Sequence, residues 1–406
     1  MGLNMKEKQA VTREYKGRYQ KASKKEKKAL LDEFIKLTGY HRKYAVRLLG
    51  AKPTKQVMFY TDGKAVKLKP EKKRPSNRKG KRIYNDEVIA CLRLVWRFFW
   101  FKCGKILAPL MRQQMSFIAR WKAFGITPEI AERLEKISPA SIDRYLKKDK
   151  ENLKVKVKSL TKPIDSLKSR IPIRTFYSSH ERKTPGFWQT DTVHHCGQAT
   201  YGHYILSLTA TDVFSGWIEP RSLLNNAHSW TFKALSDIRG SVPLPVLEFH
   251  SDNGSEFINN TTEAWCKKEG IAFTRSRSHK KNDNCFVEQK NGAVIREYVG
   301  YDRLEGLQEQ ALLAAIYRPL APLLNFFMPT QRLKSKTRVG SKEIKVYDEP
   351  RSPFQRLMDS AQLPQVTKDS LEKQISLYNP VELQHNVNKA IMHLRQRLAQ
   401  ANRKTT

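Results

Sequence analysis

The sequence has few cysteines and no long apolar segment, and both absences limit what the protein can be. Its five cysteines are scattered through 406 residues without paired spacing, which favours a reducing compartment over a disulfide framework. A membrane-spanning helix needs about 18 apolar residues, whereas Arg93 and Arg97 interrupt the best candidate, residues 88–101. The first ten residues, MGLNMKEKQA, include no apolar stretch, so no signal peptide is expected. We therefore expect neither a membrane protein nor a secreted one.

Acidic residues are scarce relative to basic ones. The sequence has 39 Asp and Glu against 76 Lys and Arg, a net charge of +37, while 39% of its residues are hydrophobic. That apolar content is too high for a disordered polycation, and the length predicts two to four domains. Residues 1–180, 181–310 and 311–406 carry net charges of +30, −2 and +9. Basic arms around a near-neutral centre indicate a core flanked by parts that bind a polyanion.

Residues 1–60 predict a helical DNA-binding module. Ser23 and Glu26 form an S-x-x-E capping box before an apolar-periodic run, and Gly39 supplies the C-cap of that helix. A second, basic helix follows a short turn, as in a helix-turn-helix motif, although an ordinary helical hairpin has the same spacing. The basic outer face of this second helix favours DNA binding. Its outward basic residues are Arg42, Lys43 and Arg47.

Residues 61–84 predict a basic linker. Ten Lys or Arg and one Glu occupy residues 64–82, together with Pro and Gly but without apolar periodicity. Such a segment can follow a phosphate backbone or insert Arg into a minor groove, and it can equally act as a tether. The residues expected to contact DNA are Lys72, Lys73, Arg74, Arg78 and Lys79.

Residues 85–150 predict a second helix-turn-helix module, and residues 151–186 predict another linker. Asn85 caps a helix with one apolar face, and Thr127 and Ser138 each precede a proline, as at helix starts. The last helix of this module has an apolar inner face and a basic outer face. Its outward basic residues are Arg144, Lys147 and Lys148.

Residues 187–328 change to a pattern of strands and helices. Three strands, over residues 188–193, 204–212 and 217–223, come first, and helices then alternate with two further apolar strands. This order predicts a mixed α/β sheet.

Three acidic residues of this region lie where loops and solvent faces do not easily explain them. Asp191 lies inside a strand, in WQTDTV, although strands are depleted in Asp. Asp252 directly follows an apolar strand, in FHSDNGSEF, and Glu288 lies on a helix, in NDNCFVEQKNGAVIRE. Thirty-five residues separate Asp252 from Glu288.

This triplet and its flanks resemble the D,D,E superfamily of transposases and retroviral integrases. HSDNGSEF and NDNCFVEQKNG are similar to the second and third motifs of its catalytic core. LTGYHRKYAVRLL, IPIRTF and KTRVGSKEIKVYDEPRSPFQRLM resemble flanking segments of bacterial insertion-sequence transposases, so the resemblance extends over about residues 10–360. It implies an α/β, ribonuclease-H-like mixed-sheet catalytic core, preceded by all-α helix-turn-helix modules and followed by a small basic β/α tail.

The resemblance also implies a reaction and its partners. A transposase of this kind binds the DNA ends of its element, cleaves their 3′ ends and joins them to target DNA, with two Mg²⁺ or Mn²⁺ ions per active site. We expect Asp191, Asp252 and Glu288 to be the catalytic residues and metal ligands, because hard cations prefer oxygen ligands. The expected partners are double-stranded DNA and further copies of the chain, as a homodimer or larger homo-oligomer, in the bacterial cytoplasm.

One departure from retroviral integrases concerns zinc. Residues 1–150 lack the His-His-Cys-Cys spacing of an N-terminal zinc module, so no structural zinc is expected.

Other polar residues near the triplet have simpler explanations. Asp212 precedes a Phe-Ser-Gly turn and is predicted to cap it. His194, His195 and Cys196 are consecutive, and the alternating faces of a strand keep them from converging on one metal ion. Four basic residues around the third motif either hold DNA phosphates or form a solvated basic face. They are Lys280, Lys281, Lys290 and Arg296.

Residues 329–406 predict a basic C-terminal region. The alternation over residues 331–347 indicates a basic hairpin, and a terminal helix over about residues 380–401 serves oligomerisation or packs on the core. Before this region, a helix over residues 305–327 is expected to be interrupted by Pro319 and Pro322. The hairpin residues expected to contact DNA are Lys334, Lys336 and Arg338.

Two other functions fit parts of this pattern. A non-catalytic DNA-binding regulator derived from a transposase would keep the DNA-binding modules, although the intact acidic triplet argues against it. A ribonuclease-H-like hydrolase that cuts RNA in hybrids would need a fourth carboxylate in the cleft, which the sequence pattern does not identify.

Overall fold

The structure divides into two compact units. In this computed structural model the described residues are 3–50, 58–61, 64–67, 83–151, 183–252, 254, 256–277, 281–339 and 342–405. One unit comprises residues 1–82 and 335–346, and the other comprises residues 83–334 and 347–406. The predicted DNA contacts Lys72, Lys73, Arg74, Arg78 and Lys79 lie outside the described residues, as does most of the predicted linker at residues 151–186.

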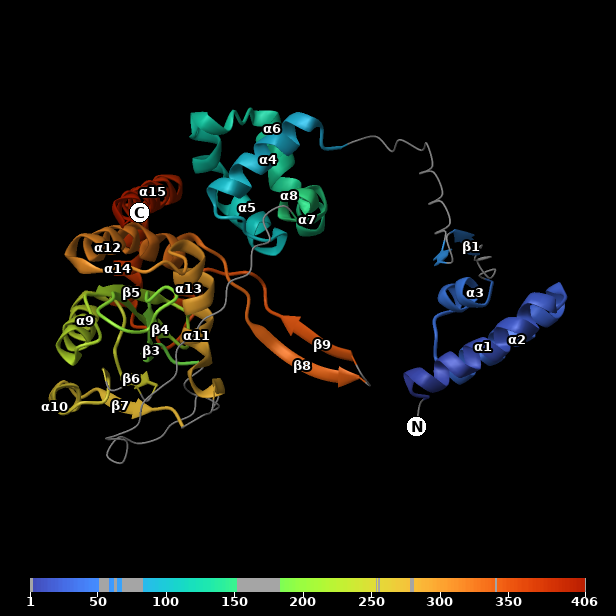
Figure 1. Ribbon diagram of the computed structural model, residues 1–406, viewed down its shortest axis with the longest axis horizontal. Coiled ribbons are helices and arrows are strands. Elements are labelled where there is room, and N and C mark those ends of the chain that lie inside the picture. Colours follow the sequence, from blue (N-terminus) through green and yellow to red (C-terminus); the bar gives the residue numbers. More distant parts are fainter. Residues whose placement is uncertain are drawn as a thin grey trace. The chain divides into compact units, whose positions relative to one another are not determined.

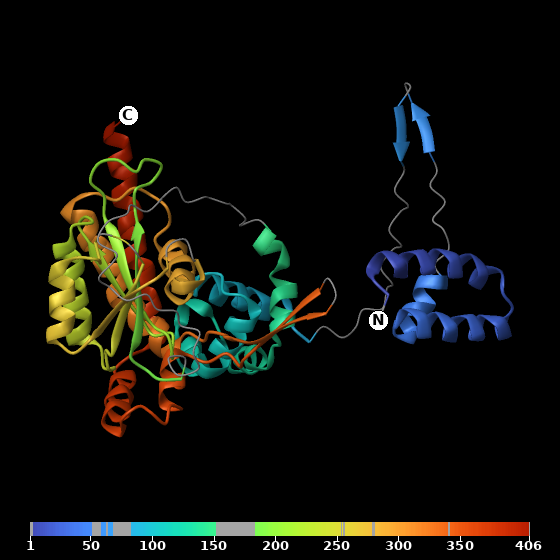
Figure 2. The same cartoon turned by 90° about the horizontal axis from the view of Figure 1, so that it is seen from below.

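Three helices build the first unit, and Figure 2 shows the first two as a helical hairpin. The predicted capping box at Ser23 and Glu26 is present, and Gly39 ends the second helix at φ 66°. The sequence pattern did not predict the first helix, although Asn4 and Glu7 form a capping box there as well. The helices are α1 (Met5–Lys21), α2 (Lys24–Thr38) and α3 (Arg42–Gly50). Their buried apolar residues are Tyr15, Leu31, Phe34, Ala45 and Leu49.

Two further sheets of the described residues are short and have two strands each. Strands β1 (Met58–Thr61) and β2 (Lys64–Lys67) pair antiparallel. Strands β8 (Leu333–Val339) and β9 (Lys342–Tyr347) form the predicted basic hairpin.

The second unit begins with a helical part whose buried apolar residues form one cluster with residues of the sheet and of the C-terminal helices. The predicted caps are present, because the side chains of Asn85, Thr127 and Ser138 each accept a hydrogen bond from a backbone N–H of the first helical turn. The helices are α4 (Asp86–Phe98), α5 (Gly104–Arg120), η1 (Lys122–Phe124), α6 (Pro128–Lys136), α7 (Pro139–Tyr145) and α8 (Lys147–Glu151).

A five-stranded mixed sheet forms the centre of the second unit (Figure 1). Strands β3, β4 and β5 pair antiparallel as a meander, whereas β6 and β7 continue the sheet in parallel with β3. The order β5-β4-β3-β6-β7 confirms the predicted ribonuclease-H-like α/β core. The strands are β3 (Phe187–His194), β4 (Leu206–Asp212), β5 (Ile218–Leu223), β6 (Glu248–Ser251) and β7 (Ala272–Arg275).

Five described helical segments that follow the first three strands pack against this sheet or lead into it. Helix α9 contacts β5, α10 contacts β7, and α11 lies across β3 and β4. The predicted helix over residues 284–298 is present, but its second half is a π-helical turn, η3. The segments are α9 (His228–Ser241), α10 (Asn260–Lys268), η2 (Lys281–Asn284), α11 (Cys285–Lys290) and η3 (Asn291–Arg296).

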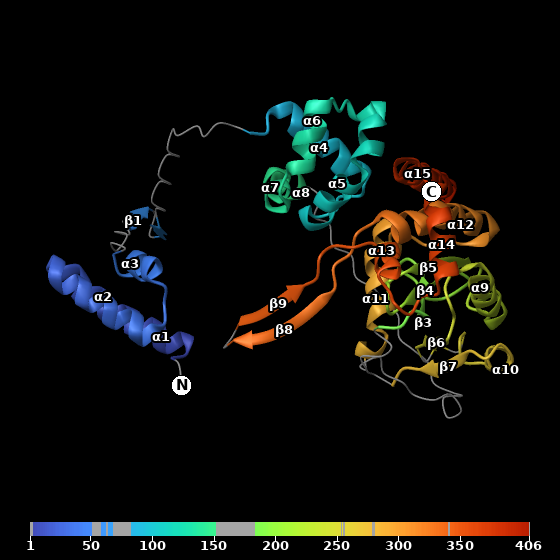
Figure 3. The same cartoon turned by 180° about the vertical axis from the view of Figure 1, so that it is seen from behind.

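The C-terminal helices cover the core. The expected interruption at Pro319 is wrong, because α12 continues through it while Ile316 and Leu320 remain buried in the core. The terminal helix α15 packs along α12, as Figure 3 also shows. No helix of the described segments is long and apolar enough to cross a bilayer. These helices are α12 (Gly306–Pro322), η4 (Leu323–Phe327), α13 (Pro353–Met358), α14 (Gln365–Ser376) and α15 (Pro380–Thr405).

The fold of the first unit should depend on Phe34, which is fully buried. We expect Phe34→Ala to destabilise this unit by about 3–5 kcal/mol, because the deletion leaves a cavity among few core residues. Thermal unfolding of the full chain, followed by circular dichroism, measures the effect. Leu37→Ala on the same helix is the control, since Leu37 is 47% exposed and should change stability by less than about 0.5 kcal/mol. Equal effects of the two variants would contradict the packing described.

Candidate active site

Two of the three predicted carboxylates lie side by side because of strand register. Strands β3 and β6 run parallel, with Thr190 opposite Ser251. The next residues along the two strands are Asp191, still inside β3, and Asp252, directly after β6, so the parallel register brings the two carboxylates close together. Both side chains are half-buried.

The third carboxylate comes from α11, whose start is fixed to β3 by a buried glutamine. Gln189 Oε1 accepts hydrogen bonds from the backbone N–H groups of Phe286 (3.0 Å) and Val287 (3.3 Å). Its Nε2 donates to the carbonyl of Asp283 at 2.9 Å. Gln189 lies on the same face of β3 as Asp191, two residues along, and Glu288 follows Val287 directly. The glutamine therefore holds the helix that carries Glu288 against the strand that carries Asp191.

The Asp191 carboxylate has its own hydrogen-bond donors. Asn291 Nδ2 donates to Oδ2 at 2.7 Å, and the backbone N–H of Thr192 donates to Oδ1 at 2.8 Å. Burial raises the pKa of Asp191 well above its usual value, and the charges of Asp252 and Glu288 raise it further. The three predicted residues thus form one electrostatic cluster, although they are far apart in sequence.

The chemistry of this cluster fits a hard divalent cation, but the three side chains do not converge on one ion position. Three carboxylates supply oxygen ligands, and like charges that repel one another favour a cation between them. Among the described residues, no three His, Cys, Asp or Glu side chains are arranged to hold an ion. The Glu288 side chain is exposed.

The structure adds a fourth carboxylate, Glu256, that the sequence analysis missed. Its Oε1 accepts a hydrogen bond from Thr192 Oγ1 at 2.9 Å, and its charge also raises the pKa of Asp191. A Cβ at Gly254 would lie 2.6 Å from Glu256 Oε2, so the carboxylate lies directly against this glycine. The signal was present in HSDNGSEF, four residues after Asp252, but a segment without secondary structure gives no periodicity to reveal it.

The structure agrees with the structural explanations that the sequence suggested for Asp212, His194 and His195. Asp212 caps its turn, because it accepts hydrogen bonds from the backbone N–H of Ser215 (2.6 Å) and of Gly186 (2.8 Å). The ring of His194 bonds to Tyr204 at 3.1 Å, and that of His195 bonds to Ser207 at 2.7 Å, so the two rings have different partners. Burial lowers the pKa of His195 to about 3, which keeps the ring neutral.

The basic residues around the third motif have different environments. Lys280 lies outside the described residues, and for Lys281 only the backbone, in η2, is described. Arg296 donates to the carbonyls of His194 (2.9 Å) and Gly300 (3.3 Å), which ties the end of η3 to β3. Burial, followed by the charges of Arg332, Arg356 and Lys102, lowers the pKa of Lys290 to about 8.

The predicted DNA contacts on the arms are exposed. On α3, Arg42 pairs with Asp32, and on β8, Lys336 pairs with Glu343 at 2.9 Å. Exposed ion pairs of this kind contribute little to stability and separate readily when another anion binds. The exposed basic residues are Arg42, Lys43, Arg47, Arg144, Lys147, Lys148, Lys334, Lys336 and Arg338.

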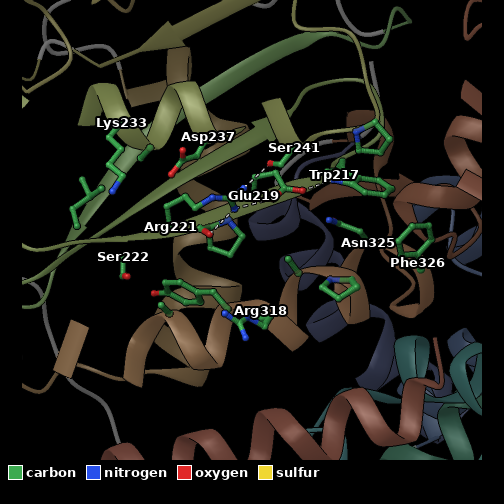
Figure 4. Close-up of a pocket in the computed structure, with 18 of the residues that line it drawn as sticks. Trp217, Glu219, Arg221, Ser222, Lys233, Asp237, Ser241, Arg318, Asn325 and Phe326 are labelled. Atoms are coloured by element: carbon green, nitrogen blue, oxygen red, sulfur yellow. Dashed lines mark hydrogen bonds and ion pairs between the residues drawn. The ribbon is translucent and has the colours of Figure 1, made fainter. Parts of the chain in front are cut away.

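A separate pocket of about 550 Å³ lies between β5, α9 and α12. Figure 4 shows Arg221 bridging Glu219 and Ser241 on one wall, with Arg318 on the other. None of the three predicted carboxylates lines it. The acidic cluster therefore lies outside this pocket.

Known proteins are similar to this chain in its centre and over most of its length. The family model of the integrase core domain matches residues 181–281. The uncharacterized protein y4rM of Sinorhizobium fredii (strain NBRC 101917 / NGR234) is 31% identical over 339 residues, covering 84% of this chain and 91% of that protein.

Two solved structures are similar to part of the chain. The catalytic core domain of BIV integrase matches at 18% identity with a TM-score of 0.28, over 47% of this chain and 97% of that one. The HTLV-2 integrase catalytic core domain in complex with magnesium (dimeric form) matches at 20% identity with a TM-score of 0.26, over 37% and 92%.

Gln189 should matter for stability as well as for geometry. Gln189→Met removes both hydrogen-bonding ends and leaves buried backbone groups of α11 without partners, so we expect a loss of about 1–3 kcal/mol. Urea unfolding of the full chain measures it. Gln289→Met, on the exposed side of α11, is the matched control and should be nearly neutral. A neutral Gln189→Met would show that α11 is held by other contacts.

The raised pKa of Asp191 predicts a pH-dependent effect of its removal. A carboxyl with a higher pKa in the folded protein binds more protons when folded, so stability falls as the pH rises from the unfolded value, about 3.9, toward the folded one. We therefore expect Asp191→Asn to raise the melting temperature of EDTA-treated protein at neutral pH, by about 2–4 °C per kcal/mol gained. The gain should shrink as the pH is lowered toward 3.9.

The exposed Asp237, on α9, provides the comparison, and Asp237→Asn should change the melting temperature little at any pH. A gain for Asp191→Asn that does not vary with pH would contradict the assigned cause.

Proposed function

Because this chain belongs to the D,D,E superfamily of transposases and integrases, we propose that it is a transposase. In this proposal it binds element-end DNA and catalyses metal-dependent 3′-end cleavage and strand transfer into target DNA. The observation that carries the proposal is the placement of Asp191, inside β3, beside Asp252, which directly follows the paired strand β6, within the electrostatic reach of Glu288.

Asp191, Asp252 and Glu288 are the residues that would hold two Mg²⁺ or Mn²⁺ ions. Because the charges of Asp252 and Glu288 raise the pKa of Asp191, bound cations would relieve the repulsion among the three carboxylates. Divalent ions bound there stabilise the negative charge that develops on the attacked phosphate. The helical position of Glu288 allows it to adjust between two successive reactions, while Gln189 and Asn291 hold the helix and the Asp191 carboxylate in place.

The proposed reactions are two phosphoryl transfers at one site, without a covalent enzyme intermediate. In the first, the oxygen of water bonds to phosphorus and the 3′ oxygen of the element end leaves as a hydroxyl. In the second, that 3′-hydroxyl attacks a target phosphodiester, and the target's own 3′ oxygen leaves. Each step exchanges one phosphorus–oxygen bond for another, so positioning of the strands limits the rate more than bond energy does.

DNA is proposed to be held by the basic arms and by the neighbourhood of the third motif. Lys or Arg contacts to phosphates give binding that weakens steeply with salt. Joining two ends in one complex requires at least two copies of the chain, so a homodimer or larger homo-oligomer is proposed on DNA. The contacts proposed beyond the exposed set named above are Lys72, Lys73, Arg74, Arg78, Lys79, Lys280, Lys281, Lys290 and Arg296.

A second candidate function is supported by Glu256. A hydrolase that cuts RNA in RNA–DNA hybrids would need a fourth carboxylate, and Glu256 lies close enough to raise the pKa of Asp191. Its carboxylate is engaged by Thr192, whose side chain points to the opposite face of β3 from Asp191. This orientation favours the transposase.

Strand joining by purified protein tests the function. Labelled duplexes from the DNA that flanks the reading frame, incubated with Mg²⁺ or Mn²⁺ and target DNA, should yield joined products. Asp191→Asn should lower the yield by about 100-fold or more, because metal stabilisation of the transition state contributes several kcal/mol.

Asp237→Asn should join strands like the unmodified chain, because Asp237 lies on α9, in the separate pocket. Joining by Asp191→Asn at the normal rate would refute the assigned site. Cleavage of a labelled RNA–DNA hybrid without any joining would favour the hydrolase. Specific DNA binding without either reaction would favour a regulator.

A further inference from the structure

A half-exposed notch lies where the β4–β5 turn meets α11. Gly216, in this turn, has φ +77° and no side chain. A Cβ at this position would lie 3.4 Å from Arg332 Nη2 and 3.8 Å from Lys290 Nζ. Two cationic groups from distant parts of the chain therefore face the same small space, which only a glycine leaves open.

The arginine side of the notch is fixed in place. Arg332 Nη2 donates to the carbonyl of Val213 at 3.2 Å, in the same turn. The backbone N–H of Arg332 donates to Asp348 Oδ1 at 2.6 Å, and Arg356 pairs with the other oxygen of Asp348 at 2.6 Å. Because its backbone and guanidinium are both held, Arg332 is preorganised to face the notch.

The lysine side of the notch has no acceptor. Within the part of the chain that the structure describes, Lys290 Nζ forms no hydrogen bond and no ion pair. Three carboxylates of the same unit are already engaged: Asp212 caps the turn, Asp348 is shared by Arg332 and Arg356, and Glu297 pairs with Lys102 at 2.7 Å. An ammonium held beside other cations without an acceptor is costly unless an anion binds there.

We propose that Lys290 and Arg332 together bind a backbone phosphate of the DNA that occupies the active site. This rests on the proposed function. A guanidinium offers two parallel donors and an ammonium offers a compact charge, and phosphate accepts both. Lys290 follows Glu288 by two residues on the same helix, and Arg332 directly precedes β8 with its basic residues. The notch thus joins the catalytic helix to the chain segment that leads into the basic hairpin.

The substitution Lys290→Met tests the proposal, because it keeps the length of the side chain and removes its charge. The dissociation constant of the full chain for a labelled duplex from the flanking DNA is measured over a salt series. Loss of one phosphate contact should reduce the slope of log K against log salt concentration by about 0.9. Lys290→Arg, which keeps a cation in the notch, should retain the slope.

Lys233→Met provides the matched control, since it removes the same charge from α9, where Lys233 is exposed and lines the separate pocket. It should leave the slope unchanged. The melting temperature without DNA gives the second measurement. Lys290→Met should not lower it, because the removed ammonium has no hydrogen-bond or ion-pair partner among the described residues. A lower melting temperature with an unchanged slope would overturn the proposal in favour of a structural lysine.

Two further outcomes are informative. Inorganic phosphate that binds the notch should raise the melting temperature of the chain. If Lys290→Met reduces this rise but leaves the slope of log K against log salt concentration for DNA unchanged, the notch binds a free anion and the proposal is overturned. If the unmodified chain fails to join strands while Lys290→Met still reduces the slope, the proposed reaction fails and the phosphate contact stands. The failure of one proposal is therefore distinguishable from the failure of the other.

Discussion

The parallel pairing of β3 with β6 is the constraint on which the rest of the site depends. It brings Asp191, inside β3, next to Asp252, directly after β6, and two carboxylates held together repel one another. A flexible site would relieve this repulsion by moving apart. Here the strands are central in the sheet, so the backbone cannot move apart. The repulsion is therefore relieved by protonation or by a bound cation. The two carboxylates are stable side by side only if a cation binds between them or one of them is protonated.

The neighbouring contacts keep this strained arrangement ordered. Gln189 fixes the start of α11 to β3 through three hydrogen bonds, and Asn291 donates directly to Asp191. The helix becomes π-helical from Asn291 onward, and wider turns of this kind often occur at functional sites. Its far end is held by Arg296, which reaches a carbonyl of β3. Helix and strand are thus joined at both ends of the acidic cluster.

The sequence predicted features that depend on local interactions. Ser23, Asn85, Thr127 and Ser138 cap helices because their side chains reach backbone groups three residues away, which spacing alone reveals. Strand alternation and the family resemblance predicted the sheet. Contacts between residues far apart, such as Gln189 with α11, leave no periodic trace in a single sequence. Helix α1 had a local signal in its capping box, but its apolar residues are too sparse to mark a face.

The separation of charge along the chain follows from the needs of the site. A carboxylate cluster surrounded by many lysines would form ion pairs with them, and those pairs would compete with a metal ion for the same oxygens. The near-neutral centre avoids this competition, while the arms retain the positive charge that draws DNA in. Lys290 belongs to the near-neutral centre of the chain, and Arg332 belongs to the basic C-terminal arm. Both side chains approach Gly216, in the β4–β5 turn, where they are proposed to attract a phosphate.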